Sequence, residues 1–218
     1  MKSRFKGIIF DVDGTLTFTN RLIFDSFNHI TQKYLGRKFS DEEIIALFGP
    51  TEDVILKEMC KDEYEVARKE YYQYYKENHN IARTYAGIET LIEDLFNDKI
   101  ILGVFTGKGR TSALITLDEL GLTDYFGLIV SGDDVVNHKP HPEGIKKFLE
   151  QYNLSPDEVL MVGDAPSDIK AAKAAGVSIA SVIWDSYSED EVKKLNPENI
   201  FHSVEELRGF IFKEQERS

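Results

Sequence analysis

The hydrophobic pattern near the start of the chain predicts a buried strand that ends at two acidic residues. An apolar run at residues 7–10 stops at Asp11 and Asp13, and Gly14 and Thr15 follow directly. Such a run is typical of a parallel strand, because helices cover both of its faces. Side chains two residues apart on an extended chain point the same way, so we expect both aspartates to face one site. The alternative is an acidic turn, since Asp and Gly are common turn residues.

The following stretch, up to about residue 83, has a helical period. Apolar residues at positions 23, 27, 30 and 34 recur every three or four residues, as on one face of an amphipathic helix. A capping box at residues 40–43 predicts a short helix that runs through Phe48 and ends at Gly49-Pro50. Thr51 is a candidate cap for the next helix. Because no strand-like run interrupts this region, residues 18–83 are predicted to form a separate all-helical cap.

Five tyrosines lie on the last helix predicted for this region, at positions 64, 71, 72, 74 and 75. They can form a platform for a substrate, or they can be half-buried packing between helices. Packing is the more common role of such residues, and it is the interpretation that we favour.

Helices and strands alternate from about residue 85 onward. Strands are predicted at residues 100–105, 128–130, 159–162, 179–184 and 200–201, and the helices between them include 112–120 and 168–175. Alternation of this kind implies βαβ units and a parallel sheet. The predicted fold is therefore α/β, with a Rossmann-like parallel sheet core formed by residues 1–17 and 84–218 and the helical cap inserted at 18–83.

Composition excludes some classes of partner. The chain has 218 residues and a formal net charge of −12, which argues against a nucleic-acid partner. Its first apolar run is too short for a signal or membrane helix, so we expect no membrane partner and a cytoplasmic location. Cys60 is the only cysteine, so no internal disulfide can form. A monomer and a homodimer are both compatible with these features.

Chemistry-bearing side chains lie at or just beyond the carboxyl ends of four predicted strands: Asp11, Asp13, Thr106, Lys139, Asp164 and Asp168. In a doubly wound sheet these strand ends lie side by side. Crowded carboxylates repel one another unless a cation joins them, and a set of oxygen ligands without histidine or cysteine favours Mg²⁺. A lysine and a hydroxyl beside the metal are suited to a phosphoryl group. The pattern therefore predicts phosphoryl transfer to an aspartate.

Four motifs resemble those of the haloacid dehalogenase-like hydrolases, and the likeness covers nearly the whole chain. They are Asp11-Val12-Asp13-Gly14-Thr15, Thr106-Gly107-Lys108, Lys139-Pro140 and Gly163-Asp164-Ala165-Pro166-Ser167-Asp168. Within that family the chain most resembles the group of phosphoglycolate phosphatases, pyrophosphatases and β-phosphoglucomutases. The predicted helical insertion is similar to the helical cap of that group. In one respect the chain departs from the pattern. The second motif often has asparagine after the hydroxyl residue, whereas Gly107 stands here.

The resemblance implies a role for each motif residue. Asp11 would attack phosphorus and form an aspartyl-phosphate, and Asp13 would protonate the leaving oxygen and later take a proton from water. Thr106, Gly107 and Lys139 would bind the substrate, with Thr106 and Lys139 on the phosphoryl oxygens. Mg²⁺ would be held by Asp11, the backbone carbonyl of Asp13 and Asp164, with Asp168 in support.

These roles predict a Mg²⁺-dependent phosphatase for small phosphorylated metabolites, a phosphoric monoester hydrolase similar to phosphoglycolate phosphatase. A phosphomutase acting on sugar phosphates and a pyrophosphatase are the alternatives. True dehalogenases of the superfamily lack the second aspartate of the first motif, so Asp13 favours phosphate chemistry. A receiver domain phosphorylated on aspartate is a weaker alternative, because the candidate acceptor ends the first strand and a cap follows it.

Several other polar residues near the motifs have two interpretations each. His138 and His141 flank Lys139 and can bind metal or phosphate, although histidines in a polar loop are more often solvated. Lys108 and Arg110 can attract an anionic substrate or form the exposed face of a helix. The cap surface around residues 48–51 is expected to select the leaving group, and the cap is expected to hinge near residues 17–20 and 83–87. The substrate itself is not predicted.

Overall fold

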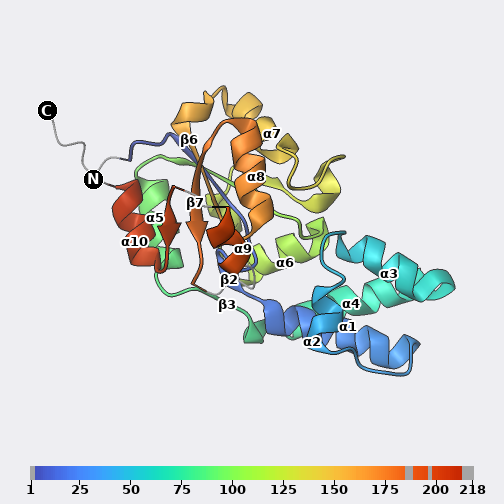
Figure 1. Ribbon diagram of the computed structural model, residues 1–218. Coiled ribbons are helices and arrows are strands. Elements are labelled where there is room, and N and C mark those ends of the chain that lie inside the picture. Colours follow the sequence, from blue (N-terminus) through green and yellow to red (C-terminus); the bar gives the residue numbers. More distant parts are fainter. Residues whose placement is uncertain (1–2, 185–188, 196–197, 213–218) are drawn as a thin grey trace, which may run out of the picture.

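The computed structural model describes residues 3–184, 189–195 and 198–212, and its core is a six-stranded parallel sheet (Figure 1). In spatial order the strands are β5 (Leu128–Val130), β4 (Ile101–Phe105), β1 (Gly7–Phe10), β6 (Val159–Gly163), β7 (Ser178–Val182) and β8 (Ile200–Phe201). The chain goes from β1 to β4 on one side and later crosses to β6 on the other. The predicted α/β fold with a Rossmann-like core is confirmed, and β1 stands where ligands bind in such sheets.

Helices cover both faces of the sheet. One face carries α5 (Ile88–Asn97), α6 (Arg110–Glu119) and α10 (Val204–Ile211), and the other carries α7 (Glu143–Tyr152), α8 (Pro166–Ala175) and α9 (Glu189–Lys194). Successive β1 side chains explain this arrangement, because Ile8 and Phe10 enter the first hydrophobic cluster while Ile9 enters the second. Because such a strand is buried on both faces, its polar neighbours in the sequence lie where the strand ends.

Four helices pack apart from the sheet, at the lower right of Figure 1. They are α1 (Asn20–Tyr34), α2 (Asp41–Ile45), α3 (Glu52–Cys60) and α4 (Tyr64–Glu77). Their apolar faces form a third cluster around Phe27, Leu56 and Tyr71. The interpretation of the tyrosines as packing holds for Tyr71, Tyr72 and Tyr75, all of which are buried. We call these four helices the cap.

The cap contacts the core both at its root and beyond it. Where the chain leaves and re-enters the core, β2 (Thr17–Phe18) and β3 (Arg83–Thr84) pair as an antiparallel ribbon that the sequence pattern did not predict. Farther along, α4 of the cap contacts α6 of the core, where the Tyr75 hydroxyl lies 2.8 Å from Thr116 Oγ1. The cap is therefore held both at its root and along one side.

Several element boundaries differ from the prediction. Helix α2 ends at Ile45, three residues before the expected Phe48. Helix α8 begins at Pro166 rather than residue 168, as expected for a proline that supplies a helical φ at the first position. Strand β7 ends at Val182 instead of 184. Single turns of 3₁₀ helix lie at Lys61–Glu63, His79–Ile81, Thr123–Tyr125, Gly132–Asp134 and Pro156–Glu158.

None of the helices in the described ranges is both long enough and apolar enough to cross a membrane.

Candidate active site

The first motif turns sharply at the carboxyl end of β1. Gly14 adopts φ +80°, a conformation that side chains rarely allow, and a Cβ atom there would lie 2.4 Å from Asp164 Oδ2. The Asp164 carboxylate, which follows β6, is also held by a hydrogen bond of 3.2 Å from Thr15 Oγ1. A glycine is therefore required at this turn so that the ends of β1 and β6 can approach each other.

Three carboxylates gather at this edge of the sheet. Oxygens of Asp11, Asp164 and Asp168 lie within 4.8 Å of one another. Burial raises the pKa of Asp11 to about 6, with Lys139 opposing the shift and the charge of Asp168 adding to it. Burial, reinforced by the charge of Asp11, raises the pKa of Asp164 well above its usual range. These raised pKa values mean that it is unfavourable to ionise all three carboxylates so close together unless a cation neutralises their charges.

Lys139 supplies one positive charge to this cluster. Its side chain is only 6% exposed, and Nζ lies 3.0 Å from Asp11 Oδ1 and 2.6 Å from Asp168 Oδ1. Burial lowers the pKa of Lys139, but Asp11 and Asp168 together outweigh that effect and raise it. The other oxygen of Asp168 accepts the Ala165 N–H at 3.0 Å, at the start of α8. Asp168 therefore holds Lys139 and the loop after β6 in place with both of its oxygens.

The donor set of this cluster fits Mg²⁺. All of its ligand atoms are carboxylate oxygens, the hard ligands that Mg²⁺ prefers. Asp11 Oδ1 is buried and accepts no hydrogen bond in the described part of the chain, although Lys139 is close enough for an ion pair. A buried carboxylate oxygen without a hydrogen bond is costly unless another group satisfies it. The side chain of Asp13 is not in the cluster, so only its backbone carbonyl is left as the predicted ligand.

The second motif follows β4, the strand that pairs with β1 in the sheet. Thr106 is buried at the end of β4, and its hydroxyl accepts the backbone N–H of Lys108 at 3.2 Å. A cavity of about 360 Å³ opens between this motif and the cap. Of the predicted site residues, it is lined by Asp11, Asp13, Thr106, Gly107, Lys139 and Asp164, whereas Asp168 lies buried behind it.

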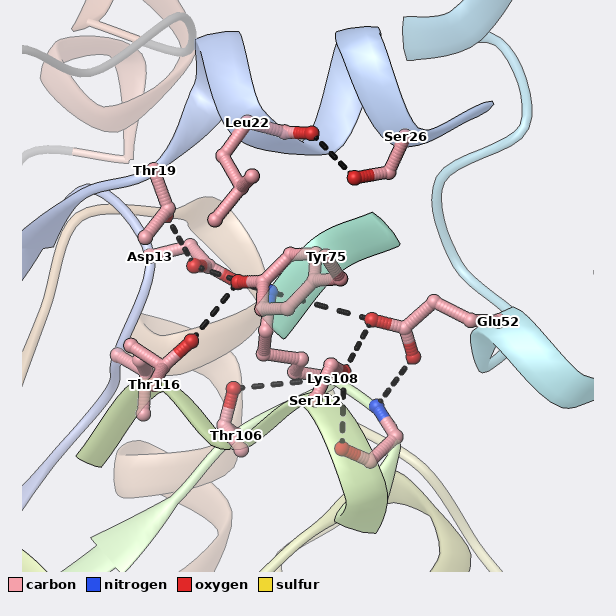
Figure 2. Close-up of polar contacts among 12 residues, drawn as sticks. Asp13, Thr19, Leu22, Ser26, Glu52, Tyr75, Thr106, Lys108, Ser112 and Thr116 are labelled. Carbon is pink, nitrogen blue, oxygen red and sulfur yellow. Dashed lines mark hydrogen bonds and ion pairs between the residues drawn. The ribbon is translucent and has the colours of Figure 1, made fainter. Parts of the chain in front are cut away.

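Lys108 is the centre of a second polar network, drawn in Figure 2. Its side chain is 2% exposed, and Nζ lies 3.1 Å from Asp13 Oδ2 and 3.9 Å from Glu52 Oε1. Nζ also lies 5.0 Å from the centre of the Tyr75 ring. Burial lowers the pKa of Lys108, but Asp13, Tyr75 and Glu52 together raise it. The interpretation of Lys108 as an exposed helix residue is therefore wrong, because its charge is held against the second aspartate of the first motif.

Arg110 is exposed, as one of its two interpretations predicts. Its side chain is 48% exposed and forms an ion pair of 2.7 Å with Asp134.

Glu52 connects the cap to this network. It is the first residue of α3, and its carboxylate accepts the Gly109 N–H at 2.7 Å and the Ser112 hydroxyl at the start of α6 (Figure 2). A Cβ at position 109 would lie 2.5 Å from Glu52 Oε2, so glycine lets the carboxylate reach the backbone. Negative charge at a helix N-terminus is favourable, so Glu52 caps a core helix from the cap.

Asp13 is held by two donors that come from different elements. One is Lys108, and the other is the Thr19 hydroxyl, just before α1, which donates to Asp13 Oδ1. Sequence reasoning did not identify Thr19 or Glu52. Glu52 directly follows the candidate cap Thr51, where the dipole of its own helix is enough to account for an acid, and no local signal connects it to residue 109.

The two histidines beside Lys139 differ in position. His138 is exposed at the rim and still lines the cavity, whereas His141 is exposed and is not among the residues that line it.

A parallel α/β core, an inserted helical cap and an acidic cluster at the end of β1 define the class of this protein. The chain belongs to the haloacid dehalogenase-like hydrolases, since the sequence profile of that family matches residues 8–182. It is 33% identical to pyrophosphatase PpaX of Bacillus pumilus over 211 residues, which is 96% of this chain and 98% of the relative.

Two solved structures extend the comparison. A protein from Haemophilus somnus 129pt, described as a predicted phosphoglycolate phosphatase, is similar with a TM-score of 0.78 and 26% identity, covering 91% of this chain and 94% of that one. A protein from Thermotoga maritima, provisionally described as a beta-phosphoglucomutase, is similar with a TM-score of 0.73 and 27% identity, covering 93% and 96%. The chain is therefore a hydrolase of this family, and its relatives carry phosphatase, pyrophosphatase and phosphomutase names.

Proposed function

We propose that the protein is a Mg²⁺-dependent phosphatase that hydrolyses small phosphorylated metabolites through an aspartyl-phosphate on Asp11. The observation that carries the proposal is the position of Asp11. Its carboxylate lies at the wall of the cavity, among two further carboxylates and 3.0 Å from the ammonium of Lys139. A carboxylate held beside a cation and open to a cavity is suited to attack phosphorus.

In the first step, an oxygen of Asp11 forms a bond to phosphorus while the bond from phosphorus to the leaving oxygen breaks. Asp13 gives its proton to that oxygen, so the product leaves as a neutral alcohol. Lys139 and the Thr106 hydroxyl bind the phosphoryl oxygens and stabilise the charge that is spread over the transferred group.

In the second step, water attacks the phosphorus of the aspartyl-phosphate. Asp13 takes a proton from that water, the bond between phosphorus and Asp11 breaks, and phosphate is released with the Asp11 carboxylate restored. The hydrogen bonds to Asp13 from Lys108 and Thr19 are suited to this stage, because both donors stabilise an ionised carboxylate.

Asp11, Asp164 and the backbone carbonyl of Asp13 would hold Mg²⁺, with Asp168 supporting the site through Lys139 and Ala165. When bound, the ion supplies positive charge for the phosphoryl oxygens and for the crowded carboxylates.

The cap, proposed to comprise residues 18–83, closes the cavity and excludes bulk water. Both of its connections to the core run through the β2–β3 ribbon, so a hinge at residues 17–20 and 83–87 would move it as a unit. The Glu52 contacts with Gly109 and Ser112 would hold the closed state.

Pyrophosphate hydrolysis is the second candidate, because a relative with 33% identity is named a pyrophosphatase. A phosphomutase would return the phosphoryl group to a sugar before water arrives.

The test is to assay released phosphate from a panel of phosphate esters and pyrophosphate with Mg²⁺, for the wild type and for Asp11→Asn. We expect the wild type to release phosphate and the variant to release none. After acid quenching of the wild type, the peptide that contains Asp11 should carry a phosphoryl group. Activity of Asp11→Asn near that of the wild type would refute the mechanism. Accumulation of an isomeric sugar phosphate without released phosphate would identify a mutase.

A further inference from the structure

We infer that the cap selects phosphate monoesters whose leaving group is apolar and uncharged. The inference rests on the proposed function and concerns the wall of the cavity opposite Asp11. Helices α1 and α3 and the loop before α3 contribute that wall, through Ile23, Phe27, Phe48, Pro50 and Ile55. A leaving group attached to a phosphoryl group at Asp11 must point toward this wall, since the carboxylates and Lys139 occupy the other end of the cavity.

The charges around the cavity do not favour an anionic leaving group. Within the described part of the chain, the one ionisable side chain that the cap contributes to the lining is Glu52, an acid. The two lysines that line the cavity are both already paired, Lys139 with Asp11 and Asp168, and Lys108 with Asp13 and Glu52. His138 is exposed at the rim, on the core side.

A carboxylate or second phosphate on the leaving group would lose its water against apolar side chains and would lie on the same wall as Glu52. Burying a charge without a partner is strongly unfavourable, and like charges add to that cost. A leaving group with many hydroxyls is also a poor match. Its hydroxyls need partners, and the cap side chains that line the cavity include a single uncharged polar group, the amide of Asn20, in the described ranges.

For an apolar leaving group, transfer from water to the cap wall is favourable. The free energy gained is proportional to the apolar surface that the group buries. The cavity, at about 360 Å³, is within the usual range for small-molecule sites, so there is room for a short alkyl or aryl group beside the phosphoryl group. The wall therefore discriminates by hydrophobic burial rather than by a charge contact.

The test compares two substrates of nearly the same shape. Isobutyl phosphate has an isopropyl group in place of the carboxylate of phosphoglycolate, so two methyl groups stand where the carboxylate oxygens were. A series from methyl to butyl phosphate varies the buried surface alone. We expect kcat/KM to rise about threefold to fourfold per added methylene, the value for transfer of one methylene out of water. We expect kcat/KM for isobutyl phosphate to exceed that for phosphoglycolate and pyrophosphate by at least about tenfold, because burying a charge without a partner is strongly unfavourable.

A variant of the wall tests whether these side chains cause the preference. Phe48 lines the cavity but is 45% exposed, so Phe48→Lys is compatible with folding. This variant should flatten the alkyl series and raise kcat/KM for phosphoglycolate. Val66→Lys is the matched control, because Val66 is 58% exposed on α4 and is not among the lining residues. It should leave the substrate order unchanged.

The outcomes separate this inference from the proposed function. If the protein prefers phosphoglycolate over isobutyl phosphate, the inference is refuted and the phosphatase proposal stands. If it prefers pyrophosphate, the inference is refuted and the second candidate function is favoured. If kcat/KM does not rise from methyl to butyl phosphate, the inference is likewise refuted and the phosphatase proposal stands. If no phosphate ester or pyrophosphate is hydrolysed with Mg²⁺, the proposed function itself is refuted. A rising series that Phe48→Lys flattens and Val66→Lys does not would support the inference.

Discussion

Replacement of Lys108 by methionine removes one buried cation and leaves the shape of the side chain nearly unchanged. The Lys108 side chain is 2% exposed, and Nζ is shared between Asp13 and Glu52, whose side chains are 25% and 8% exposed. Without the ammonium, two carboxylates would remain close together with no cation between them. Loss of one partner from a buried ion pair costs about 3–5 kcal/mol, and the partial exposure of Asp13 favours the lower end of that range.

We therefore expect Lys108→Met to lower the free energy of unfolding by about 3 kcal/mol, a change that leaves a protein of ordinary stability folded. Urea denaturation followed by circular dichroism, near neutral pH and without Mg²⁺, measures it. Adding Glu52→Gln to the variant should restore about half of the loss, because the amide still accepts from Gly109 and carries no charge. Phosphate release should also fall, since Asp13 loses a donor.

The control is Lys76→Met, because Lys76 is 61% exposed and lies 3.8 Å from Glu119. An exposed pair contributes about 0–1 kcal/mol, so this variant should unfold almost as the wild type does. If Lys108→Met is equally neutral, or if Glu52→Gln worsens it, the interpretation of Lys108 as a buried bridge between cap and core is wrong.

Four further predictions follow from the geometry. Asp11→Asn should abolish phosphate release while leaving the circular dichroism spectrum unchanged, because an amide is a poor nucleophile; residual turnover near the wild-type rate would contradict this. Mg²⁺ should raise the thermal unfolding midpoint more at about pH 7.5 than at about pH 5, because Mg²⁺ must displace protons from Asp11, whose pKa is about 6, and from Asp164, whose pKa burial also raises; equal shifts would contradict binding of Mg²⁺ by these carboxylates. Gly14→Ala should weaken Mg²⁺ binding by calorimetry, since its Cβ would lie 2.4 Å from Asp164 Oδ2; wild-type affinity would show that the turn can adjust. Glu52→Ala should lower kcat/KM at least about tenfold, because the hydrogen bonds proposed to hold the cap closed are lost and each such bond to a charged group contributes about 1.5–3 kcal/mol. Glu58→Ala, at an exposed position on α3, should leave kcat/KM unchanged.

The residues at the strand ends could be predicted because each breaks a local rule. Charged and hydroxyl residues at the ends of apolar strands, as at Asp11, Thr106 and Asp164, have no packing role, so they indicate a site. The sheet then brings them together, because parallel strands end at one edge. The same signal is absent for Glu52. A glutamate in the first turn of a helix is fully accounted for by that helix, and only tertiary packing directs it to Gly109.

The burial of Lys108 and the β2–β3 ribbon were not predicted, for different reasons. A lysine next to glycines is usually solvated, and its burial here depends on the cap residues Glu52 and Tyr75, which are distant in sequence. Strands of two residues are too short to have a recognisable alternation, so the pairing of 17–18 with 83–84 comes only from the fold. The apolar wall of the cavity is likewise a product of three segments that no periodicity connects.

The β2–β3 pairing has a consequence for how such a protein can diversify. Thr17 pairs with Thr84 and Phe18 with Arg83, so the entire insertion begins and ends at neighbouring positions of one small ribbon. For the sheet, replacing the insertion by another of different length changes the length of a single connection, and the loop-closure free energy depends only weakly on that length. Under the proposed function, exchange of the helical module would change the specificity, while the aspartates that follow β1 would keep the same proposed chemistry.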